Sequence, residues 1–187
     1  TLTDSSAASD VYKRQAQHRD YHFTEKPLKP SWTLYLGRIE PRKRQYLYQD
    51  IYGVEFVGKY TDTTSFDRSR DCYLGQWEHE YKLQHVTDYG NMMLLSDGEN
   101  GTPLVIKEAL VAGLGVVVSK YAAHDLDTSL PFVTVIPDDK WEDIEYVQMK
   151  LIENRKISVT MRKEIRQYGV DNFSWQKLVK TYVENIE

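Results

Sequence analysis

The stretch NMMLLSDGENGTPLVIKEALVAGLGVVVS, residues 91–119, decides the fold class. It opens with a nearly continuous apolar run at 91–96, continues through an apolar helical segment at 103–113 and ends with the β-rich run GVVVS at 115–119. Apolar strands joined by a helix are typical of parallel sheets that are buried on both faces. The stretch therefore predicts a strand, a crossover helix and a second strand of an α/β domain.

The alternation of strands and helices continues on both sides of this stretch. Strands are predicted at 32–37, 53–58, 72–75 and 132–136, and helices at 41–51, 78–89, 138–154, 157–168 and 172–186. This order predicts a Rossmann-like three-layer α/β domain over residues 26–187, with a mainly parallel sheet that helices cover on both faces.

The N-terminal residues differ in composition from the rest of the chain. TLTDSSAASDVYKRQ at 1–15 is rich in Ser, Ala and Asp, has no strand or helix periodicity and lacks an initiator methionine. It resembles a string that recurs at the ends of mis-assembled sequence reads. We therefore expect residues 1–25 to be a disordered, non-native tail, with no packed structure before about Lys26 and with the true N-terminal part missing.

Composition excludes several classes of protein. The chain has 187 residues, of which 41% are hydrophobic, enough for one core. Its net charge of −4 is not the polybasic signature of a nucleic-acid-binding protein, so we expect no nucleic-acid partner. The single cysteine, Cys72, excludes an internal disulfide and a C-x-x-C site. No apolar run approaches the roughly 20 residues that span a bilayer, and we expect a cytoplasmic protein.

A candidate anion site lies where residues 96–113 pass from a predicted strand into a predicted helix. Thr102 is the expected N-cap of that helix, and Pro103 occupies the first helical position. Ligands of open α/β sheets bind at the carboxyl ends of the strands, and a helix N-terminus there presents free N–H groups and a partial positive charge. We therefore predict that a phosphate group binds at this helix.

Glu108 lies in the same predicted helix, one turn from the apolar residues Leu104 and Ala112. It follows Pro103 by five residues, roughly 7–8 Å along the axis, about the distance from a nucleotide's diphosphate to its ribose hydroxyls. A carboxylate at that point can accept two hydrogen bonds from a vicinal diol. The alternative is a solvated surface glutamate, the common role of Glu in helices.

A second candidate site is GRIEPRKR at 37–44, directly after the first predicted strand. Gly37 permits a sharp turn, and the cations of Arg38 and Lys43 can reach the same crevice and bind a diphosphate. The alternative is a basic helix start on the surface. We prefer this alternative for the remaining arginines, Arg42 and Arg44.

Together these motifs resemble a protein family. GRIEPRK at 37–43, DGENGTPLVIKEALVAG at 97–113 and Phe173-Ser-Trp175 are similar to the C-terminal, donor-binding domain of GT-B-fold retaining glycosyltransferases of the large glycosyltransferase group 1 (family four) class. The resemblance covers about residues 31–187. It implies a nucleotide-sugar donor, transfer with retention, and no metal or other cofactor. It also implies a missing N-terminal half that holds the acceptor. Without that half we expect the chain to be inactive, and we expect any peripheral membrane association to occur through it.

The resemblance also implies roles for single residues. Gly37, Arg38 and Lys43 match family residues that bind the donor diphosphate. Arg38 and Lys43 are the expected catalytic residues, because they would stabilise the negative charge of the departing diphosphate. Glu108 matches the glutamate that binds the ribose. The residues before it that we expect to line the donor site are Gly101, Thr102, Pro103 and Leu104.

The sequence departs from the family at one position. Family members carry another glutamate, which binds the transferred sugar, with seven residues between it and the ribose-binding glutamate. This chain has Asn100 there, and Glu99 stands one residue earlier. Either a shift of the loop brings Glu99 to the sugar, or Asn100 makes the contact through its amide.

Two other functions use parts of the same pattern. A nucleotide-sugar epimerase also needs diphosphate and ribose contacts. A noncatalytic α/β interaction module of the receiver kind would carry an acidic cluster where Arg38 and Lys43 stand.

No metal site is predicted, because His79 and His85 are six residues apart on one predicted helix and do not share a face. The donor base, the sugar and the acceptor do not follow from the sequence.

Overall fold

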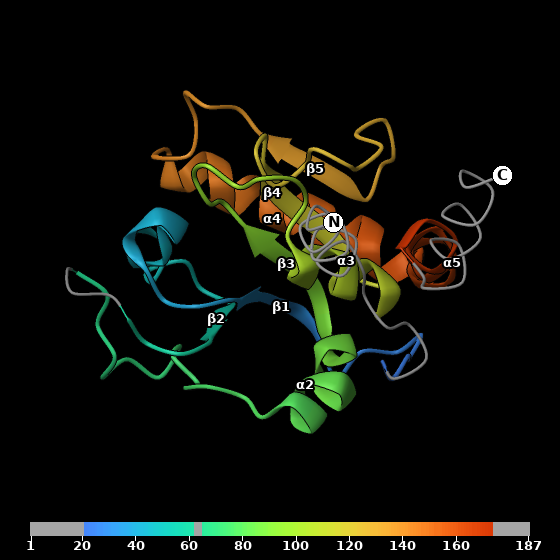
Figure 1. The fold of residues 1–187 in the computed structure, drawn as a ribbon, viewed down its shortest axis with the longest axis horizontal. Coiled ribbons are helices and arrows are strands. Elements are labelled where there is room, and N and C mark those ends of the chain that lie inside the picture. Colours follow the sequence, from blue (N-terminus) through green and yellow to red (C-terminus); the bar gives the residue numbers. More distant parts are fainter. Residues whose placement is uncertain (1–20, 62–64, 174–187) are drawn as a thin grey trace, which may run out of the picture.

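The computed structural model describes residues 21–61 and 65–173 of the chain (Figure 1). The strands are β1 (Lys29–Leu36), β2 (Val54–Val57), β3 (Tyr89–Leu94), β4 (Gly115–Ser119) and β5 (Val133–Ile136). The α-helices are α2 (His79–His85), α3 (Leu104–Val111), α4 (Ile144–Thr160) and α5 (Arg162–Phe173). The 3-10 helices are η1 (Pro41–Lys43), η2 (Gln45–Leu47) and η3 (Val86–Asp88).

The strands form a five-stranded sheet in the order β2-β1-β3-β4-β5, and every neighbouring pair is parallel. The chain places β2 on one side of β1 and then returns to place β3 on the other side. The crevice beyond the carboxyl ends of β1 and β3 is therefore the topological switch point, where open α/β sheets bind their ligands. The predicted fold class, a Rossmann-like α/β domain, is confirmed.

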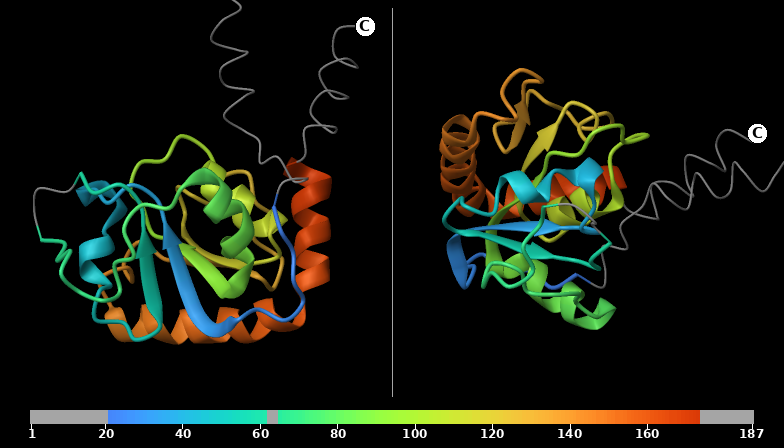
Figure 2. Two further views of the ribbon diagram at one scale, coloured as in Figure 1. Left: turned by 90° about the horizontal axis from the view of Figure 1, so that it is seen from below. Right: turned by 90° about the vertical axis from the view of Figure 1, so that its left-hand side faces the viewer.

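The central strands are buried as their apolar sequences predict. Every residue of β2, β3 and β4 is buried. Helix α4 crosses four of the five strands (Figure 2), and its fully buried Asn154 donates to the carbonyls of Val116 at 3.2 Å and Phe132 at 3.1 Å. Buried amides must be satisfied in this way, so these bonds fix α4 on the sheet. Helix α5 packs on α3 so closely that a Cβ added at Gly169 would lie 2.6 Å from the Leu110 carbonyl carbon.

The helix predicted at 41–51 is wrong. The segment forms the two short 3-10 helices η1 and η2, separated by Arg44, whose φ of 56° is left-handed. A left-handed residue cannot continue the hydrogen-bond ladder of an α-helix. The resulting tight turn keeps Lys43 beside the end of β1, where the Tyr35 hydroxyl donates to the Lys43 carbonyl.

The strand predicted at 72–75 is reduced to an isolated bridge. This segment lies beside the outer edge of β2, where Tyr73 pairs with Phe56 in parallel orientation. The Phe56 amide donates to the Cys72 carbonyl at 2.7 Å, and the Leu74 amide donates to the Phe56 carbonyl at 2.9 Å. The segment thus covers the sheet edge without forming a regular strand.

Packed structure begins before Lys26, so the expected boundary of the tail is wrong. Tyr21 is buried, and the His22 amide donates to the Leu83 carbonyl at 2.9 Å. The guanidinium of Arg162, on α5, donates to the Thr24 carbonyl at 3.1 Å. A contact between such distant parts of the chain leaves no local pattern in the sequence.

The C-terminal helices also differ from their predicted bounds. Helix α4 continues to Thr160, through the break expected between 154 and 157. Its buried side chains in this part are polar, Arg155 and Ser158 among them, so apolar periodicity does not reveal the face that packs. The helix expected at 172–186 lies outside the described residues beyond Phe173. No helix within the described ranges is both long and apolar enough to cross a membrane.

Gly58 allows the end of β2 to approach the end of β1, and we expect Gly58→Ala to be strongly destabilising. A Cβ at this position would lie 1.9 Å from the Gly37 carbonyl oxygen. Because backbone must move to relieve this clash, the free energy of unfolding should fall by about 3 kcal/mol in urea titrations. Gly98→Ala is the matched control, since its φ of +67° is also positive but nothing lies within 4 Å of the added Cβ. Equal falls in the free energy of unfolding of Gly58→Ala and Gly98→Ala would show that the clash with Gly37 is not the cause.

Candidate functional site at the carboxyl ends of β1 and β3

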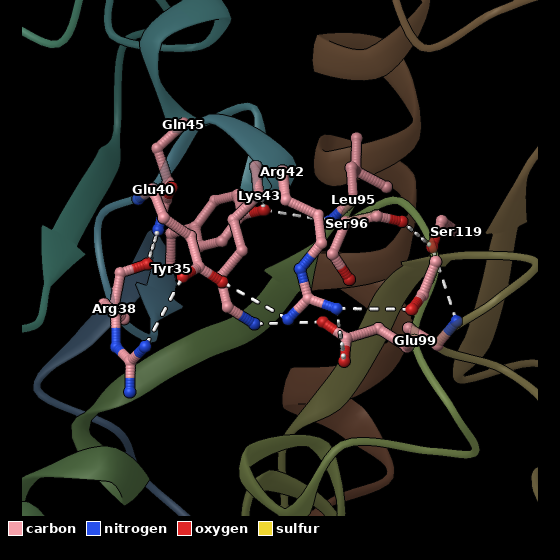
Figure 3. A network of polar contacts seen from close by, with 12 residues as sticks. Tyr35, Arg38, Glu40, Arg42, Lys43, Gln45, Leu95, Ser96, Glu99 and Ser119 are labelled. Carbon is pink, nitrogen blue, oxygen red and sulfur yellow. Dashed lines mark hydrogen bonds and ion pairs between the residues drawn. The ribbon is translucent and has the colours of Figure 1, made fainter. Parts of the chain in front are cut away.

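Two loops meet at the switch point, residues 37–44 after β1 and residues 95–103 after β3 (Figure 3). The Tyr35 hydroxyl joins them, because it donates to the Lys43 carbonyl and accepts from the Leu95 amide at 3.1 Å. Burial raises the pKa of Tyr35 well above its usual value, so the phenol keeps the proton that it donates. Tyr35 was not among the predicted site residues, since its place in an apolar strand indicates only a core role.

Lys43 and Glu99, both predicted site residues, are brought together. The Lys43 ammonium lies 3.0 Å from Glu99 Oε1, and both side chains are nearly buried. Burial alone would raise the pKa of Glu99, but the charge and hydrogen bond of Lys43 hold that pKa below its usual value. The pair therefore places a fixed cation and a fixed anion at the mouth of the crevice.

Arg38 lies at the rim of the crevice, and its side chain is 63% exposed. Its ion pair with Glu40 is long, 3.7 Å from Nη1 to Oε2. Gly37, the other member of the predicted motif, lies against Lys43, and a Cβ added there would contact the Lys43 Cδ at 3.4 Å. Arg38 is thus available to an incoming anion, whereas Lys43 is held in place.

The expected surface role of Arg42 and Arg44 is only partly right. Arg42 is half-exposed but spans the crevice, donating from Nη1 to the Gly98 carbonyl at 3.2 Å. The guanidinium of Arg44 stacks on the Trp141 ring at 3.9 Å and pairs with Asp97 at 3.4 Å. These contacts give both arginines a part in shaping the two loops.

The start of α3 differs from the prediction. Pro103 is the N-cap, and Thr102 does not cap the helix but accepts a hydrogen bond from the Asp125 amide through Oγ1 at 2.9 Å. The Asp125 carboxylate in turn accepts from the Thr102 amide at 3.4 Å and from Lys107 Nζ at 3.1 Å. Burial opposes ionisation of Asp125, but hydrogen bonds from His124 and Lys107 lower its pKa. An acidic residue that the sequence did not single out therefore already lies at this helix start.

Three further predicted residues lie on the open side of the loop. Asn100 and Leu104 are exposed, Leu104 on the first turn of α3, and Gly101 is partly exposed. The φ of Gly101 is +87°, which a residue with a side chain rarely adopts. The loop can thus turn sharply into α3 and present the Asn100 amide outward.

Glu108 is buried, so it is not the solvated surface glutamate of the alternative interpretation. Its carboxylate pairs with Lys82 of α2, whose Nζ donates to Oε1 at 2.9 Å and to Oε2 at 3.1 Å. Lys82 was not predicted, because a single lysine in a polar helix is an unremarkable feature of a sequence. Glu108 is therefore tied to a different element from the pair of Lys43 and Glu99.

The remaining candidates contribute no site. His85 Nδ1 lies 2.8 Å from Asp88 Oδ2, and His79 is exposed at the start of α2. Within the described ranges, no group of three or more His, Cys, Asp or Glu side chains is placed to hold a metal ion. Trp77 is half-buried and packs against Tyr89 at 6.2 Å between ring centroids.

Comparison with known proteins places the fold among glycosyltransferases. No protein-family model and no curated protein matches the sequence. Solved structures do match. AviGT4, a glycosyltransferase involved in avilamycin A biosynthesis, is 19% identical with a TM-score of 0.65, over 91% of this chain and 54% of that one. Sucrose-phosphate synthase from Thermosynechococcus elongatus is 15% identical with a TM-score of 0.66, over 92% of this chain and 50% of that one.

A third similar structure is HepE from Anabaena in complex with UDP and glucose, 14% identical with a TM-score of 0.65. The match covers 92% of this chain and 55% of HepE. The chain thus spans about half the length of each of these proteins. The resemblance to a half of a GT-B-fold glycosyltransferase is confirmed at the level of the fold.

Proposed function

We propose that the chain is the donor-binding half of a glycosyltransferase that takes its sugar from a nucleoside diphosphate sugar. The observation that carries the proposal is the buried Lys43 cation held at the switch point, with the exposed guanidinium of Arg38 on the same loop. Cations at the carboxyl edge of a parallel sheet are suited to a diphosphate. HepE, which shares the fold, has been solved with UDP and with UDP-glucose, and these complexes support the same class of ligand here.

In this proposal Arg38 and Lys43 act on the leaving group. When the bond between the sugar C1 and the diphosphate oxygen breaks, negative charge develops on the diphosphate. The held cation of Lys43 and the exposed guanidinium of Arg38 would stabilise that charge, and no metal is needed for this task. The carboxylate of Glu108 accepts hydrogen bonds from the ribose hydroxyls. Glu99 is already paired with Lys43, so we assign the sugar contact to the exposed amide of Asn100.

The rest of the proposed enzyme lies outside this domain. An N-terminal half would hold the acceptor and carry any peripheral membrane association, and transfer would proceed with retention in the cytoplasm. These points rest on the resemblance of the motifs at 37–43 and 97–113.

Calorimetry with UDP, GDP and ADP in the presence of EDTA tests the proposal. We expect at least one of them to bind below the millimolar range without added metal. Arg38→Ala should weaken it by roughly 10- to 150-fold, because charge-assisted hydrogen bonds are worth about 1.5–3 kcal/mol. Lys150→Ala is the control, since Lys150 pairs with Glu153 on the same helix at 2.8 Å and lies away from both loops. No binding, or binding only with Mg²⁺, would overturn the proposal.

A further inference from the structure

The contact between Lys82 and Glu108 has a geometry that bears on ribose binding. Lys82 Nζ is nearly equidistant from the two carboxylate oxygens of Glu108, at 2.9 and 3.1 Å. An ammonium so placed lies between the two oxygens, on the side from which both accept hydrogen bonds together. A vicinal diol that donates one hydrogen bond to each oxygen requires the same position. Lys82 and a bidentate diol therefore exclude each other at Glu108.

The two partners differ in how firmly they are held. Glu108 is on α3, where all residues from Ile106 to Val111 are buried. Lys82 is on α2, a seven-residue helix that has no buried residue and no side-chain cap. Elements with few buried contacts open at low free-energy cost. If the pair separates, α2 is the element that moves.

Other contacts of Lys82 and of its neighbour Leu83 favour, in the free chain, the arrangement in which Lys82 pairs with Glu108. The ammonium lies 5.8 Å from the centre of the Tyr21 ring, within reach of a cation–π interaction. The Leu83 carbonyl accepts a hydrogen bond from the His22 amide at 2.9 Å, which ties α2 to the same N-terminal segment. These contacts hold Lys82 over the carboxylate, and an unpaired buried Glu108 would be costly without it.

We propose that Lys82 is a latch that closes the ribose site and thereby sets the affinity and the ribose selectivity of the donor site. The inference rests on the proposed function, in which Glu108 binds the ribose. A site that is open in only a fraction of molecules binds with its affinity reduced by that fraction. Lys82 is a positioning residue in this account, because it acts through Glu108 and not on the reacting atoms.

The test is Lys82→Met, which keeps the aliphatic stem and removes the donor. A latch closed in about 90–99% of molecules predicts that this variant binds the best nucleoside diphosphate roughly 10- to 100-fold more tightly than the unmodified chain. The 2′-deoxy form, which cannot donate two hydrogen bonds to Glu108, should change by less than about twofold. Gln84→Met, an exposed position on the same helix, is the control and should leave both affinities unchanged.

A second measurement does not depend on any variant. Hydrogen exchange of the α2 amides should accelerate when the nucleoside diphosphate is added, because Lys82 must leave Glu108, whereas the amides of α3 should stay protected. Slower exchange of α2 on binding would contradict the latch.

The outcomes are distinguishable. A Lys82→Met chain that binds the ribonucleotide more weakly, with the deoxy form unaffected, would show that Lys82 aligns Glu108 and would overturn the latch. Equal loss of both ligands would reduce Lys82 to a structural role and would also overturn it. If neither chain binds a nucleoside diphosphate while circular dichroism shows both folded, the proposed function itself fails, and the latch fails with it.

Discussion

Lys43→Met is expected to weaken nucleoside diphosphate binding roughly 100-fold, about 2.7 kcal/mol, in calorimetry. Lys43 is nearly buried and lies against Gly37, so its ammonium is already positioned for an anion before the ligand arrives. A buried charge also acts through a lower dielectric than an exposed one, which makes this loss larger than that of Arg38→Ala. Met is unbranched like Lys and one atom shorter, and it removes the charge together with the hydrogen-bond donors of the ammonium.

A matched double variant separates binding from folding. Lys43→Met leaves the Glu99 carboxylate without the cation that lies 3.0 Å from it, and the guanidinium of Arg42 is then at 3.8 Å. A nearly buried charge that loses its nearest partner destabilises the fold. Lys43→Met/Glu99→Gln removes both charges and should recover most of the free energy of unfolding. Its affinity for the nucleoside diphosphate should stay low. If affinity returns in the double variant, Lys43 serves only to neutralise Glu99, and the diphosphate assignment is wrong.

The parts of the fold that sequence predicts best are those that burial alone determines. The segments NMML at 91–94 and GVVVS at 115–119 are buried throughout in β3 and β4. Strands of a parallel sheet are buried on both faces, so the continuous apolar character of these segments predicts such a sheet. The helix between them follows from the same logic, because parallel neighbours require a crossover. Hence the fold class and the edge of the sheet that carries the two loops could both be predicted.

The errors fall where a distant contact decides the local structure. Arg44 takes a left-handed conformation while its side chain stacks on Trp141, which is far away in the sequence. Thr102 does not form the expected cap, because its amide and its hydroxyl are both hydrogen-bonded to Asp125. Sequence patterns describe what a segment prefers in isolation, and in each case a contact made by the folded chain overrides that preference.

The same distinction explains what sequence reasoning missed in the site. Motif spacing places Lys43 in the segment after β1 and Glu108 on the helix after β3, although Lys43 lies in the 3-10 helix η1 and not in an α-helix. It does not show which charge neutralises which. The pairing of Lys43 with Glu99 and of Lys82 with Glu108 joins residues from separate segments, and no periodicity within either segment records it.

The 187-residue chain alone is expected to bind the donor but not to transfer its sugar at a rate comparable to that of a two-domain enzyme. Transfer requires donor and acceptor to be held in register, and such positioning can account for about 7–11 kcal/mol of a barrier. In the proposed function the switch-point loops bind the diphosphate, and the acceptor site is in the other half. The measurement compares donor hydrolysis and transfer to a panel of acceptors by this chain and by the same chain joined to the proposed N-terminal half.

Lys43→Met tests whether the activity measured in this comparison depends on the crevice between β1 and β3. In the joined enzyme the substitution should lower acceptor-dependent transfer together with donor affinity, because the diphosphate loses a cation both in the ground state and as it departs. Comparable turnover by the 187-residue chain would refute the half-enzyme proposal. If Lys43→Met also lowers that turnover, the assignment of the donor site is supported and the acceptor site lies within this chain. If it does not fall, the activity arises away from the crevice between β1 and β3, and the assignment of Lys43 fails with it.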